Sequence, residues 1–120
     1  MSRRVLVTGA GGFLGRHCLP LLLSQGWDVH AVGRTGCPSA PDDVATYAVD
    51  LLEPGQAASL VEHVQPTHLL HLAWVTTPGV YWSSPLNHAW RDASLALVDA
   101  FLSQGGTRVV AAGTCAEYDW

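Results

Sequence analysis

The chain has 120 residues, 48% of them hydrophobic and 13% charged, with a formal net charge of −4 at pH 7. This length fits one domain, and a composition so poor in charge suits a sheet that is covered on both faces. All six basic residues are arginines scattered along the sequence, so they form no basic stripe for a nucleic acid. No apolar run approaches the ~20 residues that span a bilayer, and the three cysteines lack the spacing of a disulfide framework or a zinc site. A cytoplasmic protein that binds neither nucleic acid nor membrane is therefore expected.

Short apolar runs alternate with helical stripes along the chain, which is the pattern of parallel strands joined by crossover helices. The expected strands cover residues 4–8, 28–33, 45–49, 67–73 and 107–112. This order predicts an α/β fold: a Rossmann-type doubly wound parallel sheet of strand order 3-2-1-4-5, truncated after about five strands.

Three helices are expected between these strands. The first ends at Gly26, is kinked by Pro20, and carries on one face Leu14, Cys18, Leu21 and Leu22. The second begins at Pro54 and has helical spacing at Ala57, Leu60, Val61 and Val64. The third follows a cap at Ser84-Pro85 and buries Leu86, Trp90, Ala93, Leu97 and Phe101.

A glycine-rich turn joins the first strand to the first helix, with glycines at positions 9, 12 and 15. One glycine allows a positive φ, one lets the backbone approach a pyrophosphate, and one lets helix and strand pack closely. The phosphates can then rest on the helix N-terminus, where free amides and the macrodipole favour negative charge. The sequence therefore predicts a dinucleotide phosphate site at Gly9, Gly12, Phe13, Leu14 and Gly15.

The Thr-Gly-x-x-Gly-x-x-Gly spacing from Thr8 resembles the extended short-chain dehydrogenases, the group of nucleotide-sugar epimerases, dehydratases and reductases. The resemblance runs over almost the whole chain. It implies that the Asp50 carboxylate, in the pair with Leu51, bonds the adenine amino group. It also implies that the segment of Leu72, Ala73 and Trp74 passes under the cofactor, although the family has a second alanine where this chain has Trp74.

The same resemblance extends to the segment after the fifth expected strand, where the family carries a serine or threonine that touches the substrate. Aligning the segment on Tyr118 gives this catalytic role to Thr114, and Asp119 stands where the family has glycine. The substrate implied is a nucleotide-linked sugar.

The tip of the second expected strand indicates which nicotinamide cofactor is bound. An acidic residue about 20 positions beyond the glycines bonds the ribose 2′-hydroxyl of NAD, whereas an arginine accommodates the 2′-phosphate of NADP. The strand ends in Arg34 and carries no carboxylate there. NADP is therefore the expected cofactor, with NAD as the alternative.

Other chemistries have less support in the sequence. His68 and His71 are three apart on a strand and so face opposite sides, which argues against a metal site. Cys115 lies in no nucleophile elbow. The aromatic residues Trp74, Tyr81 and Trp82 follow the fourth strand, and they could either stack on nicotinamide or sugar or pack the loop.

The chain contains no lysine, so it lacks the Tyr-x-x-x-Lys pair that carries the proton in this family. We therefore expect residues 1–120 to be the N-terminal, NAD(P)-binding portion of a longer enzyme, with the rest of the domain and the substrate region outside it. A rival interpretation is a free-standing, non-catalytic NADP(H) sensor, and a weaker one is a methyltransferase-like fold. The bare edge of the fifth strand makes a homodimer possible.

Overall fold

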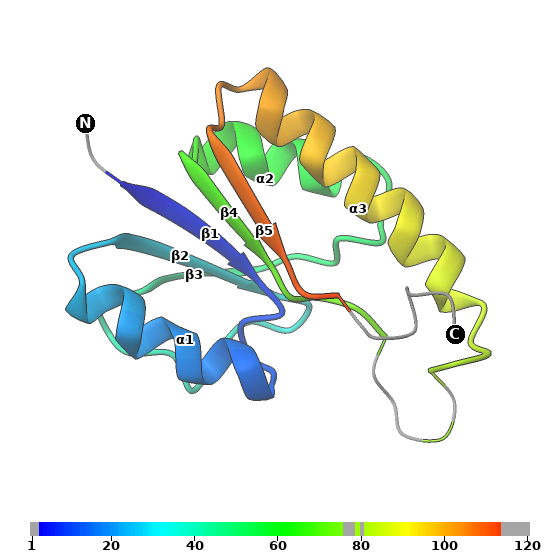
Figure 1. The fold of residues 1–120 in the computed structure, drawn as a ribbon, viewed down its shortest axis with the longest axis horizontal. Helices are drawn as coiled ribbons and strands as arrows, with labels where there is room; N and C mark the ends of the chain where they lie inside the picture. The colour runs from blue at the N-terminus through cyan, green and yellow to red at the C-terminus, as the bar shows by residue number, and fades with distance from the viewer. Residues whose placement is uncertain (1–2, 76–78, 80, 114–120) are drawn as a thin grey trace.

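The computed structural model describes residues 3–75, 79 and 81–113. The strands are β1 (Arg4–Thr8), β2 (Asp28–Gly33), β3 (Ala45–Ala48), β4 (His68–His71) and β5 (Arg108–Ala111), and the helices are α1 (Phe13–Ser24), α2 (Gln56–Val64) and α3 (Leu86–Ser103). All strand pairs are parallel and the order is β3-β2-β1-β4-β5. The predicted Rossmann-type sheet is confirmed (Figure 1).

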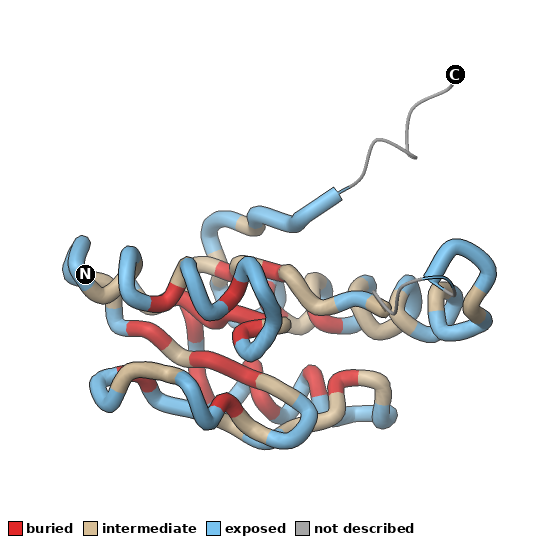
Figure 2. Tube along the Cα trace, turned by 90° about the horizontal axis from the view of Figure 1, so that it is seen from below, coloured by how far each residue is buried: buried red, intermediate tan, exposed pale blue. Residues whose placement is uncertain are grey.

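The sheet separates two layers of helices, with α2 and α3 on one face and α1 on the other (Figure 1). Successive residues of β1 point to opposite faces, so Leu6 belongs to the core under α2 and α3, whereas Val5 and Val7 belong to the core under α1. Figure 2 shows the buried parts of the chain running through the middle of the molecule. A sheet covered on both faces explains the apolar strands seen in the sequence.

The buried face of α1 differs from the predicted one. Leu14 and Leu21 are 55% and 63% exposed, whereas Gly15 and Leu19 are buried. The stripe that packs on the sheet runs from Gly15 through Leu19 to Leu22 and Leu23, about one residue round the helix from the expected one. Because Gly15 has no apolar side chain, the pattern of apolar residues gave no sign that it is buried. The pattern therefore predicted the wrong face of the helix.

The helix α1 is continuous through Pro20, which lies on the exposed side. Proline has no N–H to donate to the carbonyl four residues before it in the helix. That carbonyl therefore lies on the solvent side.

The long helix α3 follows the predicted stripe only in its second half. Leu97 and Phe101 are fully buried, Trp90 is half-buried, and Leu86 is 45% exposed. The Ser84 hydroxyl accepts the backbone N–H of Leu86 at 3.2 Å, as a residue before a helix start should. The first half of α3 is thus less deeply buried than the second, although Trp90 still packs against the core, and it is available to line a site.

Candidate functional site

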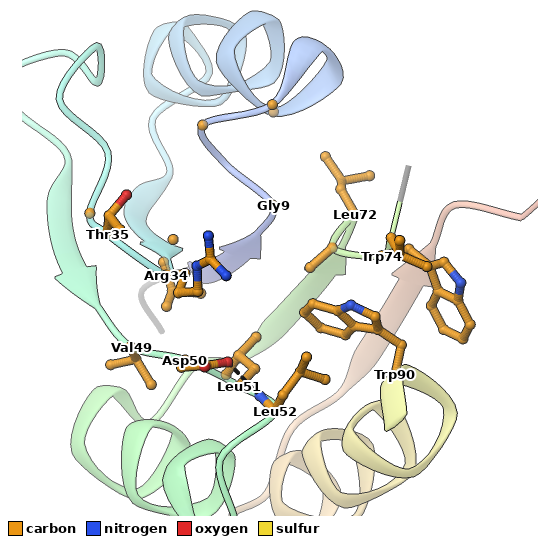
Figure 3. A pocket seen from close by; sticks show the side chains of 18 of the residues that line it. Gly9, Arg34, Thr35, Val49, Asp50, Leu51, Leu52, Leu72, Trp74 and Trp90 are labelled. Atoms are coloured by element: carbon orange, nitrogen blue, oxygen red, sulfur yellow. Dashed lines mark hydrogen bonds between the residues drawn. The ribbon is translucent and has the colours of Figure 1, made fainter. Parts of the chain in front are cut away.

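A cleft of about 780 Å³ lies where β1, β2 and β4 end, at the carboxyl edge of the sheet (Figure 3). Open α/β sheets bind ligands at this edge, where the strand order reverses. The lining residues come from the segments that follow β1, β2, β3 and β4, from the end of β2 and from the start of α3: Gly9, Gly11, Gly12, Phe13, Leu14, Gly15, Val32, Gly33, Arg34, Thr35, Gly36, Pro38, Val49, Asp50, Leu51, Leu52, Leu72, Ala73, Trp74, Val75, Leu86 and Trp90.

The loop from Gly9 to Gly15 needs its glycines for close packing. Gly9 has φ +64°, and a Cβ on it would lie 2.8 Å from the backbone nitrogen of Ala73. A Cβ on Gly15 would overlap the carbonyl oxygen of Gly9 and the Cα of Ala10. The loop is thus pressed between β4 and the first turn of α1, and no larger residue fits at either position.

Gly12 differs from these two, because a Cβ on it would meet only the Gly9 carbonyl, at 3.3 Å, and the residue is exposed to the cleft. It caps α1 without any side-chain hydrogen bond, and the first turn of α1 holds no acidic residue. The first amides of a helix have no intrahelical partner. This bare helix start fits the pyrophosphate of a dinucleotide.

At the end of β2 the chain turns sharply, with the Gly36 N–H donating to the Gly33 carbonyl at 3.1 Å. Arg34 sits in this turn with an exposed side chain, and no described carboxylate pairs with it. Asp50, after β3, accepts the Leu52 N–H through Oδ1 at 3.0 Å, which leaves its other oxygen for a ligand. Arg34 and Asp50 together form a polar end of the cleft.

The wall between β1 and β4 is held by a buried hydrogen-bond network that the sequence did not predict. Thr8 Oγ1 accepts the backbone N–H groups of Leu72 and Ala73 at 3.0 and 3.1 Å, and it lies 2.6 Å from His71 Nδ1. His71 Nε2 lies 2.8 Å from Ser94 Oγ on α3. The network ties the segment that lines the cleft to two strands and a helix.

The hydrogen positions in this network follow from the donors and acceptors. Both lone pairs of Thr8 Oγ1 accept backbone N–H groups, so its own hydrogen must point at His71 Nδ1. His71 is then neutral, with its hydrogen on Nε2, and donates to Ser94. Burial lowers the pKa of His71 and so favours the same neutral form.

The opposite end of the cleft is aromatic. Trp74 and Trp90 stack with ring centroids 6.4 Å apart and planes 29° from parallel. The Trp74 Nε1–H donates to Asn87 Oδ1 at 2.7 Å. Trp90, which the helical stripe assigned to the core, packs against the core and also lines the cleft beside Trp74 (Figure 3).

The cleft brings together all the predicted cofactor residues: Gly9, Gly12, Phe13, Leu14, Gly15, Arg34, Asp50, Leu51, Leu72, Ala73 and Trp74. Their contacts with a cofactor stay predictions. Thr114, Cys115 and Tyr118 lie outside the described residues. Sequence reasoning missed Trp90 and Leu86, for which the only signal was their place at the start of α3.

The sequence also argued against a metal site and against a membrane-spanning segment. In the part of the chain that the structure describes, no three His, Cys, Asp or Glu residues are grouped to hold a metal ion. Within the same residues, none of the helices combines the length and apolar character needed to cross a bilayer.

The chain resembles known proteins along nearly its full length. The model of the NAD dependent epimerase/dehydratase family matches residues 5–120. One curated relative, a fatty acid hydroxylase of Mycosarcoma maydis, is 51% identical over 49 residues, which are 41% of this chain and 16% of that protein.

Solved structures show the same similarity. The nucleoside-diphosphate-sugar epimerase of Agrobacterium tumefaciens matches 98% of this chain and 39% of its own, at 25% identity and a TM-score of 0.79. The UDP-glucose 4-epimerase of Thermus thermophilus, solved with NAD, matches 88% and 36%, at 27% identity and 0.77. The chain thus spans less than two fifths of the length of these two structures.

Proposed function

Because the chain belongs to the NAD-dependent epimerase/dehydratase family, we propose that it is the cofactor-binding part of an enzyme that acts on a nucleotide-linked sugar and uses NADP(H). When bound, the nicotinamide ring supplies or accepts a hydride at a sugar carbon. The observation that carries the proposal is the cleft itself, in which a glycine loop and a bare helix start lie beside Arg34.

Each part of the cleft has a role in the proposal. The amides at the start of α1 bind the pyrophosphate, and the absence of a side chain at Gly12 lets it approach. Arg34 bonds the 2′-phosphate, for which a guanidinium is suited because it can donate two parallel hydrogen bonds. The free oxygen of Asp50 accepts from the adenine amino group.

The family resemblance adds a substrate contact outside the described residues. The resemblance assigns Thr114 this contact, in which its hydroxyl would donate to a developing alkoxide or accept from a sugar hydroxyl. Nucleotide sugars are proposed as substrates because the similar structures from A. tumefaciens and T. thermophilus are named as epimerases of such compounds.

A non-catalytic NADP(H)-binding sensor is the second candidate. It requires only the cleft and no Tyr-x-x-x-Lys pair, which these 120 residues, having no lysine, do not contain. In this alternative the same cleft binds the cofactor, and a partner responds to its occupancy. In an enzyme that includes the substrate region, a nucleotide sugar oxidises bound NADPH, whereas in a sensor none does.

Cofactor binding in the cleft is tested by calorimetric titration of NADPH into the protein and a Gly12→Val variant. The valine side chain occupies the place of the phosphates, while its only close neighbour in the protein is one carbonyl. We expect NADPH binding to be lost while the protein stays folded with at most a small decrease in the unfolding midpoint, since valine is a poorer N-cap than glycine. Ala96→Val, on the exposed side of α3, is the control, and unchanged NADPH affinity in Gly12→Val would contradict the proposal.

A further inference from the structure

The aromatic end of the cleft is formed by Trp74 and Trp90. Trp74 is 42% exposed although it stacks on Trp90, and Val75 and Leu86 complete the same end. An indole left this exposed beside a cleft has a face available to a ligand. Figure 3 shows the two tryptophans across the cleft from Arg34.

The Trp74 ring is oriented by a hydrogen bond to Asn87. Asn87 donates from Nδ2 to the carbonyls of Tyr81 and Ser84, at 2.7 and 3.1 Å. Its Oδ1 must therefore face the other way, and there it accepts the Trp74 Nε1–H. A ring that is already oriented loses little conformational entropy on binding.

Charge is distributed unevenly along the cleft. Among its lining residues only Arg34 and Asp50 are charged, and both lie at the end opposite the tryptophans. His71, whose ring centroid is 6.5 Å from that of Trp90, is neutral in its hydrogen-bond network. None of the described side chains that line the aromatic end of the cleft therefore opposes or neutralises a charge brought by a ligand.

We propose that Trp74, supported by Trp90, makes the cleft discriminate between the two redox states of the cofactor and bind the oxidised nicotinamide ring more tightly. The inference rests on the proposed function. With the phosphates on the glycine loop and the adenosine half beside Arg34 and Asp50, the other half of the dinucleotide extends toward Trp74. The oxidised ring is cationic and the reduced ring is neutral, and the face of an indole attracts cations more strongly than any other side-chain ring.

This discrimination has a consequence for the bound cofactor. Tighter binding of the oxidised form lowers the reduction potential of the bound couple, because binding and redox equilibria are linked. The reduced cofactor is then a stronger hydride donor in the cleft than in water. A site of this kind favours delivery of hydride to a substrate carbonyl.

The test compares the dissociation constants of NADP⁺ and NADPH in the unmodified protein, Trp74→Leu and Trp74→Phe. The ratio of the NADPH to the NADP⁺ constant should fall about 3- to 10-fold in Trp74→Leu. Trp74→Phe should lie between, since phenylalanine retains a weaker attraction for cations. Asn87→Ala, which releases the indole without removing it, should also lower the ratio.

Two controls separate this inference from the proposed function. Trp82→Leu removes a tryptophan that is 69% exposed and does not line the cleft, so the ratio should not change. Adenosine 2′,5′-bisphosphate, which has no nicotinamide ring, should bind Trp74→Leu as tightly as it binds the unmodified protein. An unchanged ratio in Trp74→Leu, with the bisphosphate still bound, overturns the inference and leaves the proposed function standing. Failure of the unmodified protein to bind any of the three nucleotides overturns both.

Discussion

Thr8 and His71 are register partners at the ends of β1 and β4, and their side chains meet with Thr8 Oγ1 2.6 Å from His71 Nδ1. The same oxygen accepts the two backbone amides that follow β4. One hydroxyl therefore determines both the tautomer of a buried histidine and the path of the chain along the cleft.

Removal of this hydroxyl should destabilise the fold. Thr8→Val preserves shape but leaves His71 Nδ1 and the amides of Leu72 and Ala73 without a partner. Buried polar groups left unpaired cost about 1–3 kcal/mol each, and partial relaxation should limit the loss to about 3 kcal/mol. Urea unfolding measures the loss.

Thr8→Ser, which keeps the hydroxyl, should recover most of this stability. The matched control is Thr46→Val, since Thr46 is exposed on β3, and its effect should be small. A Thr8→Val protein as stable as the unmodified one would mean that the network contributes nothing to the fold.

Acid should weaken the fold through His71. Burial lowers its pKa below the ordinary value of 6.5 in the folded state. As pH falls through about 6.5, the unfolded chain takes up a proton that the folded chain resists, so the free energy of unfolding decreases and levels off only below the folded pKa. The stabilising contribution of neutral His71 is complete above pH 6.5.

This pH dependence is measured by urea unfolding between pH 7.5 and 5. His71→Asn should be less stable at pH 7.5 but should lose less stability on acidification than the unmodified protein. His88→Asn, at an exposed position of α3, should keep the original slope. Equal slopes in all three proteins would show that His71 titrates normally.

The edge of β5 should make the 120-residue chain self-associate. Among the described strands β5 pairs only with β4, and its Val110 is 54% exposed. Unpaired apolar edges recruit strands from other molecules. Light scattering should show an average mass that rises with concentration, and Val110→Lys should suppress the rise. Leu95→Lys replaces an equally exposed residue of α3, so association reduced as strongly by this change would place the contact elsewhere.

The sequence predicted those features that local rules determine. A positive φ at the turn and close packing in the first helical turn were both expected of the glycines, and Gly9 and Gly15 meet these two expectations. The predicted buried face of α1 was wrong, since Gly15 takes a core position without an apolar side chain.

Contacts between distant residues could not be predicted in this way. Thr8 and His71 are 63 positions apart, and only the register of β1 with β4 brings them together. Trp90 has the spacing of the buried face of α3. Spacing gives the face of a helix but not how far the sheet extends beneath it, so the position of Trp90 in the cleft required the structure.

The measurement that tests the central claim most directly is the cofactor preference of Arg34→Asp. Calorimetric titrations of NADPH and NADH into the unmodified protein should show NADPH binding about 10-fold more tightly, because the guanidinium bonds the 2′-phosphate. In Arg34→Asp the order should reverse, since a carboxylate repels that phosphate and can accept from a ribose hydroxyl. Arg91→Asp, on the exposed surface of α3 and outside the cleft, should keep the NADPH preference. Equal affinities for NADPH and NADH in the unmodified protein would contradict the account.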